Sequence, residues 1–337
     1  MRDGRFRQMI RRTTTAFPPR LGRRLSALAL GVVAVVLLAS TPAPAIPGVG
    51  GFRVLFEADS VYHHIVVVED AEARYLRFDR SFQSGMYLHD TFESPFRYPA
   101  YAHLGLIFSP PARRVLFVGL GGGSIPKRFW RDYPDVVVDV AELDPMVVDV
   151  AKRFFALPDD RRLQVTVADG RLFLRNTRER YDLIVLDAYY AEAIPFHLTT
   201  REFMQLTRFR LTPGGVVVSN IIGALQGPQS RLFRAMYRTT AEIFPSLYLF
   251  PVAYRPYNDP ETLRNIILMA QAEQKIAREE ILRRAGRLRG RVTYRDFLRY
   301  AGDYYDRPIA VADVPVLTDD YAPVDTLLPV YHWAPRP

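Results

Sequence analysis

The chain of 337 residues contains no cysteine, only three lysines, and no internal repeat or low-complexity tract. Without cysteine no disulfide can form, and this absence fits an oxidising and a reducing compartment equally well. Excess charge is also scarce beyond the N-terminus, because eight arginines and one aspartate place +7 of the net +9 before residue 25. The remaining +2 removes the usual electrostatic argument for a nucleic-acid partner. We therefore expect no nucleic acid, and we expect no metal site.

Long apolar runs are absent except for LSALALGVVAVVLLAS at residues 25–40, which follows the arginines and precedes TPAPA at residues 41–45. A basic start, an apolar run and small residues at Ala43 and Ala45 are typical of a secretory signal peptide. The run is shorter than the roughly 20 residues of a membrane span, but an uncleaved anchor stays open, with the arginines inside. The sequence predicts a signal peptide or membrane anchor at residues 1–45, and hence an exported or anchored protein. The alternative is an apolar helix on a cytoplasmic protein.

The body of the chain is apolar enough, at 49% hydrophobic residues, to bury a large core. Short alternating runs such as YHHIVVVED (62–70) and ARYLRFD (73–79) predict a small antiparallel β domain over residues 50–95. Residues 96–108 predict a helix that ends before Pro110. Beyond it, continuous apolar strands alternate with amphipathic helices. Residues 96–337 are therefore predicted to form an α/β domain, with a Rossmann-like, doubly wound, mostly parallel sheet and a C-terminal extension.

The clearest motif is the turn GLGGGS, which runs from Gly119 through Gly121 to Ser124 after the strand VLFV. It lacks the last glycine of GxGxxG, so a purely structural tight turn is one interpretation. Glu142 ends the next strand about 20 residues later, where an acid can accept both hydroxyls of a ribose. Asp144 competes for that role, or else caps the helix that starts at Pro145.

Further acids follow the next two strands. Asp169 and Gly170 come after LQVTVA, and Asp187 comes after YDLIVL. Because the carboxyl ends of parallel strands meet at one edge of a sheet, these groups are expected near the glycine-rich turn. Taken alone, Asp169 is equally well interpreted as a solvated loop acid. The corresponding alternative for Asp187 is a turn residue. Glycine, Glu142 and Asp169 at successive strand ends are better explained together, as a cradle for an adenosine.

The order VGLGGG, AELD, ADG and YDLIVLDAY, with a β domain in front, resembles the spermidine synthase family of polyamine aminopropyltransferases. That resemblance implies a class I methyltransferase-type fold and decarboxylated S-adenosylmethionine as co-substrate. It also implies that Glu142 binds the ribose, that Asp169 binds the adenine amino group, and that Tyr62 and His63 lie beside the cofactor. The tail LTDDYAPVD, residues 317–325, resembles that of spermidine synthase-like proteins often fused to membrane segments. A homodimer stays open.

The family's acidic residues are only partly present. Its Asp-x-x-Asp after the fourth strand becomes Asp187 and Tyr190, so Asp187 is the candidate base that deprotonates the amine. Glu192 is a candidate replacement for the missing acid, unless it is a solvated loop residue. His197 is a candidate second base, unless it packs or caps the helix beginning after Thr200. Tyr190, Glu192 and His197 are thus the expected contacts to the acceptor.

The family's acid within the glycine turn falls on Gly122, which removes a means of preferring the decarboxylated donor. Three hypotheses follow. The first is transfer of an aminopropyl group to a polyamine acceptor such as putrescine. The second is methyl transfer from ordinary S-adenosylmethionine, which the lost acids favour. The third is an exported, non-catalytic nucleoside- or polyamine-binding protein, because adenosylated donors are made in the cytoplasm.

Overall fold

The computed structural model describes residues 51–109, 111–190, 193–256, 258–288 and 290–328. The predicted signal or anchor at residues 1–45 and the candidate residue Glu192 lie outside these ranges. Within these ranges, no helix combines the length and the apolar character that crossing a bilayer requires.

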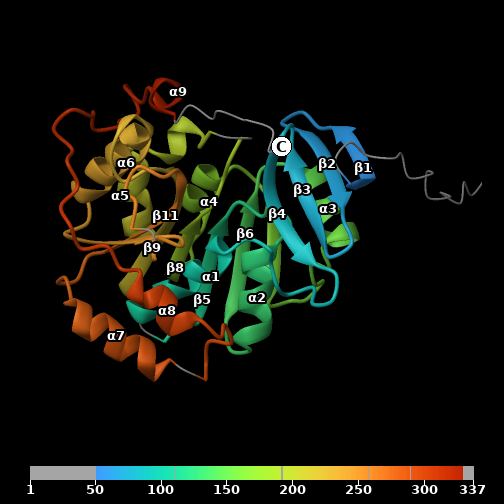
Figure 1. Ribbon diagram of the computed structural model, residues 1–337, viewed down its shortest axis with the longest axis horizontal. Helices are drawn as coiled ribbons and strands as arrows, with labels where there is room; N and C mark the ends of the chain where they lie inside the picture. Colours follow the sequence, from blue (N-terminus) through green and yellow to red (C-terminus); the bar gives the residue numbers. More distant parts are fainter. Residues whose placement is uncertain (1–50, 110, 191–192, 257, 289, 329–337) are drawn as a thin grey trace, which may run out of the picture. The chain divides into compact units, whose positions relative to one another are not determined.

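The first part of the described chain is a small antiparallel sheet, as the alternating runs predict, and it has four strands in sequential order (Figure 1). On one face, side chains of β2 and β3 such as Ile65, Val67 and Leu76 are fully buried, and they pack against Val147 and Val150 of the helix α3. The small sheet is thereby fastened to the larger one by an apolar contact. Its strands are β1 (Arg53–Asp59), β2 (His64–Glu69), β3 (Ala73–Phe78) and β4 (Ser81–Tyr87).

The second sheet has seven strands in the order β10-β11-β9-β8-β5-β6-β7. Strands β5 to β9 are mutually parallel, whereas β10 and β11 form an antiparallel extension beside β9. The predicted fold, a mostly parallel sheet after a small antiparallel one, is confirmed. The strands are β5 (Arg114–Val118), β6 (Val137–Glu142), β7 (Leu163–Val167), β8 (Tyr181–Leu186), β9 (Leu211–Gly223), β10 (Ser246–Pro251) and β11 (Arg264–Gln271).

Helices cover both faces of this sheet, so successive residues of β5 enter two different cores. Val115 and Phe117 pack on the side of α1, α2, α7 and α8, and Leu116 and Val118 pack on the side of α4, α5 and α6. The α-helices are α1 (Tyr98–Ala102), α2 (Ser124–Asp132), α3 (Pro145–Phe154), α4 (Gly170–Asn176), α5 (Arg201–Arg210), α6 (Arg231–Ala241), α7 (Arg278–Arg287), α8 (Phe297–Gly302) and α9 (Val324–Leu327), and the 3₁₀ turns are η1 (His103–Ile107), η2 (Phe196–Leu198) and η3 (Pro228–Ser230).

Strand order reverses at β5, which pairs with β6 on one side and with β8 on the other. The chain runs outward from β5 to β6 and β7, then returns to β8 and continues to β9. In open sheets of this kind the carboxyl ends of the strands at the reversal leave a crevice for ligands. The glycine-rich turn follows β5 and Asp187 follows β8, so both border this crevice.

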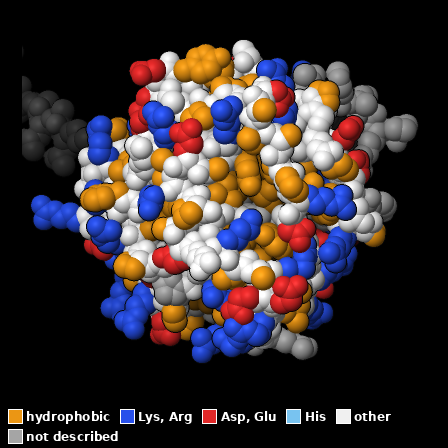
Figure 2. Space-filling model, turned by 90° about the vertical axis from the view of Figure 1, so that its left-hand side faces the viewer, with side chains coloured by type: hydrophobic (Ala, Val, Ile, Leu, Met, Phe, Trp, Pro, Cys, Tyr) orange, Lys and Arg blue, Asp and Glu red, His pale blue; other side chains and the backbone are white. Residues whose placement is uncertain are grey.

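The face toward the viewer in Figure 2 is the side on which α5, α6 and α7 lie in Figure 1. Basic and acidic side chains are interspersed there, and the ion pairs Arg234–Asp313, Arg278–Asp306 and Arg283–Glu280 join such neighbours. Among the described residues of this face, charges of one sign do not form a continuous field.

Candidate active site

A pocket opens between the small sheet and the carboxyl edge of the large one. Its walls come from β4, the start of α1, the turn after β5, the residues that end or follow β6, β7, β8 and β9, and the start of the antiparallel β11. The pocket contains most of the residues singled out from the sequence: His63, Gly119, Gly121, Glu142, Asp169, Gly170, Asp187, Tyr190 and His197.

The glycine-rich turn is held closely by the strand ends around it. Gly119 has φ 97° and Gly121 has φ 53°, a region that favours glycine. A Cβ on Gly119 would lie 2.3 Å from the Asp187 carbonyl oxygen, and one on Gly170 would lie 2.3 Å from Val118 Cγ1. Glycine is therefore required at both positions for the chain to pack as it does, and both residues also line the pocket.

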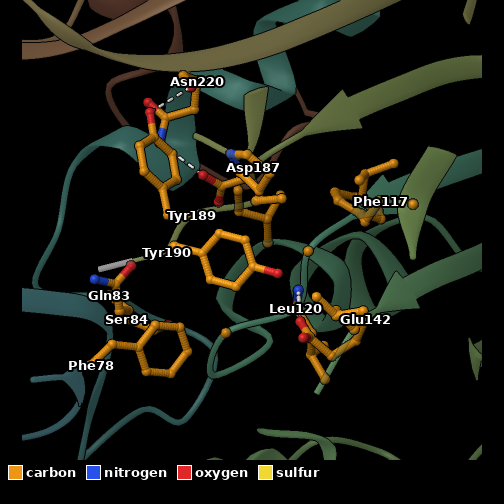
Figure 3. A pocket seen from close by; sticks show the side chains of 18 of the residues that line it. Phe78, Gln83, Ser84, Phe117, Leu120, Glu142, Asp187, Tyr189, Tyr190 and Asn220 are labelled. Atoms are coloured by element: carbon orange, nitrogen blue, oxygen red, sulfur yellow. Dashed lines mark hydrogen bonds between the residues drawn. The ribbon is translucent and has the colours of Figure 1, made fainter. Parts of the chain in front are cut away.

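Glu142 is buried at the end of β6, and both of its carboxylate oxygens are held by the main chain. The Leu120 amide donates to Oε2 at 2.8 Å, and the Asp144 amide donates to Oε1 at 2.9 Å (Figure 3). Burial raises the pKa of Glu142, while these two donors act in the opposite direction. Each oxygen keeps a further lone pair for a hydroxyl donor. The geometry thus provides a fixed acceptor beside the glycine-rich turn.

Asp144 does cap α3, because its side chain accepts from the Met146 amide at 2.9 Å. Its second oxygen lies 3.1 Å from Nδ1 of His63, whose ring stacks on Phe78 at 3.9 Å. The other ring nitrogen of His63, Nε2, is buried without a hydrogen-bond partner. A ligand in the pocket can supply that partner. Tyr62, by contrast, is 41% exposed and lies outside the pocket lining.

Asp169 is half-buried at the start of α4, rather than a solvated loop acid. Its Oδ1 accepts from the Leu172 amide at 2.8 Å, so it caps the helix, and its Oδ2 lies 2.7 Å from Nε2 of His197. The hydrogen bond from His197 is the main cause that lowers the pKa of Asp169. His197 therefore contacts the candidate nucleoside site, and Thr200 rather than His197 caps α5.

Asp187 follows β8 and is surrounded by protein groups at the other end of the pocket. Burial raises its pKa to about 6, although hydrogen bonds from Asn220 and Tyr98 oppose this shift. Asn220 Nδ2 donates to Asp187 Oδ1 at 2.8 Å (Figure 3). Asn265 Nδ2 donates to Asn220 Oδ1 at 3.0 Å. The second bond fixes the orientation of the Asn220 amide, so that its NH₂ group faces the carboxylate.

Tyr190, at the position of the family's second acid, extends its ring into the pocket between Phe78 and the Leu120–Glu142 pair (Figure 3). Its ring centroid lies 5.5 Å from that of His63, and burial raises the pKa of its hydroxyl. The residue therefore lies near the groups predicted for the cofactor. Glu192, the candidate replacement acid, lies outside the described residues.

Gly122 is closely surrounded. A Cβ there would lie 2.9 Å from Ser84 Oγ and 3.0 Å from Phe155 Cδ1. Ser84 Oγ in turn bonds Ser124 Oγ at 2.9 Å, and Ser124 donates to the Gly85 carbonyl oxygen at 3.0 Å. An acidic side chain at this position would displace these packed groups. The packing around Gly122 is thus consistent with the absence of the family's acidic side chain at this position.

Sequence reasoning did not identify several residues that line this pocket. Ser84 belongs to β4, and Tyr98 begins α1. Asn220 offered a usable signal, because it is a polar residue within the apolar run VVVSNII. Asn265 offered none, because its place depends on the pairing of β11 with β9.

A doubly wound sheet, with a glycine-rich turn after its first parallel strand and acids at the following strand ends, defines a protein of class I methyltransferase type. Residues 98–275 match the spermine/spermidine synthase domain, and the chain belongs to that family. The resemblance seen in the sequence is thereby confirmed.

Relatives of both reaction types are similar to this chain. A polyamine aminopropyltransferase of Vibrio vulnificus is 32% identical over 213 residues, which cover 60% of this chain and 69% of that protein. An eEF1A lysine and N-terminal methyltransferase of Homo sapiens is 27% identical over 183 residues, 51% of this chain and 25% of that protein. A probable spermidine synthase of Corynebacterium glutamicum shares the fold, with a TM-score of 0.58 at 19% identity over 68% of this chain and 86% of that one.

Proposed function

We propose that the protein transfers an aminopropyl group from decarboxylated S-adenosylmethionine to a small amine such as putrescine. The observation that carries this proposal is Asp187, a carboxylate with a pKa near 6 in the same pocket as Glu142 and Asp169. A base with a pKa slightly below neutral is ionised at pH 7 and still accepts a proton in the transition state.

Three features of the pocket fit an adenosyl group. Glu142 keeps free lone pairs for the two ribose hydroxyls, and Asp169 is the acceptor for the adenine amino group. His63 has a buried Nε2 that lacks a partner.

In the reaction, the donor's sulfonium supplies an electrophilic carbon and a good leaving group. The amine nitrogen bonds to that carbon, the carbon–sulfur bond breaks with its electrons on sulfur, and methylthioadenosine leaves. Asp187 first pairs with the ammonium form of the acceptor and then takes the proton that the nitrogen loses. Asn220 holds Oδ1 of Asp187, which directs the remaining lone pairs toward the acceptor.

A second candidate is methyl transfer from ordinary S-adenosylmethionine. Gly122 is the observation that favours it, because the carboxylate that would pair with the ammonium of the decarboxylated donor is absent and its place is closely packed. Without that pairing, discrimination against the carboxylated donor is lost. The similarity to a lysine and N-terminal methyltransferase agrees with this alternative.

The test combines the full chain with each donor and with putrescine, spermidine or agmatine, and follows products by mass. Asp187→Asn keeps the shape but loses charge and basicity, so turnover is expected to fall by about 10²–10⁴-fold. Binding of methylthioadenosine should be nearly unchanged, because Asp187 lies away from Glu142 and Asp169. Asp320→Asn, at an exposed aspartate outside the pocket, is the control.

The outcomes separate the hypotheses. A methylated product obtained only with the carboxylated donor supports the methyltransferase. Unchanged turnover of Asp187→Asn removes Asp187 as the base. No turnover of the unmodified chain, with methylthioadenosine still bound, supports the binding protein.

A further inference from the structure

The tail motif LTDDYAPVD brings a carboxylate to the carboxyl edge of the large sheet. Asp319 accepts from both terminal nitrogens of Arg171, at 2.7 and 2.6 Å, and from the Thr200 hydroxyl at 2.7 Å. Its own amide donates to Glu202 Oε2 at 3.0 Å. A residue near the end of the described chain is thus bonded to the first turns of α4 and α5.

Arg171 extends this connection to the pocket. Besides its two bonds to Asp319, it donates to the carbonyl oxygen of His197 at 3.2 Å. Its side chain is 24% exposed and that of Asp319 is 42% exposed, so solvent screens part of the attraction within the pair. Two parallel bonds from a guanidinium to a carboxylate also fix its direction. Asp319 therefore determines where Arg171 holds the main chain of His197.

His197 is the next member of the series. Its Nε2 lies 2.7 Å from Oδ2 of Asp169, while Oδ1 is engaged by the Leu172 amide. Both oxygens of Asp169 thus have a fixed protein partner, and their remaining lone pairs have fixed directions. A shift of His197 would rotate the carboxylate or leave Oδ2 without its donor.

We infer that Asp319 is a positioning residue for the nucleobase end of the pocket. It acts through Arg171 and His197 on Asp169, so that the carboxylate meets the 6-amino group of adenine. This inference rests on the role of Asp169 in the proposed function. It adds that the C-terminal tail sets the preference for adenine over a base with a carbonyl group at that position.

The alternative is that Asp319 only fastens α4 to α5. A fastening role would change stability and weaken all nucleosides alike. A positioning role changes the choice between nucleosides, because at position 6 adenine offers a donor to Asp169 whereas hypoxanthine offers a carbonyl oxygen. The ratio of two affinities therefore distinguishes the roles.

The experiment measures calorimetric dissociation constants of the full chain for methylthioadenosine and methylthioinosine. Asp319→Asn should lower the preference for methylthioadenosine about three- to tenfold, the scale of one ordinary hydrogen bond. The neighbouring exposed Asp320→Asn should leave it unchanged. In an Asp169→Asn background, Asp319→Asn should have little further effect on the ratio, because coupled residues are not additive.

Arg171→Gln is the second variant, since it removes the link to His197 but keeps the bonds of Asp319 to Thr200 and Glu202. It should lower the preference to the same extent, even where Asp319→Asn fails to fold. An unchanged ratio in both variants, or full additivity with Asp169→Asn, overturns the inference while leaving the proposed function intact. If the unmodified chain binds neither nucleoside, or does not discriminate between them, the proposed role of Asp169 itself fails.

Discussion

The ionisation of the Asp187 carboxylate is set by two opposing influences. Burial disfavours its charged form, and donors from Asn220 and Tyr98 restore part of that loss. The balance leaves its pKa at about 6, so the group is protonated below this pH and ionised above it. Only the ionised form can pair with an ammonium and accept its proton.

This balance predicts a pH dependence of turnover. The kcat/KM value should rise about tenfold per pH unit below pH 6 and level off above it, provided that the acceptor's own ionisation is accounted for. Asn220→Leu removes the donor to Oδ1 and should move this limb upward by about one pH unit. Asn265→Leu, which acts on Asp187 only through Asn220, should move it less. A limb that stays in place in both variants would contradict Asp187 as the titrating base.

At the scale of the element, α2 carries a lysine that the protein buries. The Lys127 side chain is almost fully buried, and its Nζ donates to the Phe155 carbonyl oxygen at 2.6 Å. Burial lowers its pKa to about 7. In the unfolded chain the corresponding value is about 10.4. Between these values the unfolded state binds a proton that the folded state has released.

Stability should therefore rise with pH from about 7 to about 10, because the unfolded state binds more protons there. Lys127→Met removes this dependence. We expect the free energy of unfolding of the variant, relative to the unmodified protein, to decrease across that range in urea titrations at successive pH values. Lys152→Met in α3, where the side chain is exposed, is the matched control and should show no such trend. Parallel pH profiles for the Lys127 variant and the parent would disprove the argument.

Elements with a strong local pattern were predictable from the sequence. The parallel strands follow from continuous apolar runs, and the caps of α3 and α5 follow from Asp144 and Thr200. Residues 96–108, predicted as one helix, form α1 followed by the 3₁₀ turn η1. Strand β4 was not predicted, because SFQSGMY contains few β-branched residues and is held by pairing with β3.

The same distinction applies to the site. The glycine-rich turn, Glu142, Asp169 and Asp187 could be placed together, because strand ends of a parallel sheet meet at one edge. Ser84 and Asn265 could not, because they reach the pocket through antiparallel pairings whose register depends on tertiary contacts. The family resemblance predicted both Tyr62 and His63 beside the cofactor; in the folded chain His63 lines the pocket, whereas Tyr62 is exposed and outside its lining.

At the scale of the whole molecule, the open question is on which side of a membrane this pocket operates. The arginine-rich start and the apolar residues 25–40 predict export or anchoring. A reporter enzyme that works only outside the cytoplasm should therefore be active when fused after Pro337. Val35→Arg interrupts the apolar run and should abolish that activity, whereas an exposed-surface change such as Lys152→Met should not.

Activity of a cytoplasmic reporter alone would reverse this prediction. The donor would then be available where it is made, which favours the transferase. Activity of the external reporter would show that the pocket lies outside the compartment in which the donor is made. That result would favour the binding protein unless a donor reaches that compartment.

The contact between Gly119 and Asp187 has a consequence for how such a protein can change. The turn and the strand end touch through their main chains, and the Asp187 amide donates to the Val118 carbonyl oxygen at 2.9 Å. The separation between the glycine-rich turn and Asp187, the proposed base, is therefore a property of the backbone. Side chains at positions such as Tyr190 can be exchanged by drift while this separation stays constant. Single substitutions can thus alter which small molecules the pocket admits, while the distance between the glycine-rich turn and Asp187 is unchanged at every step.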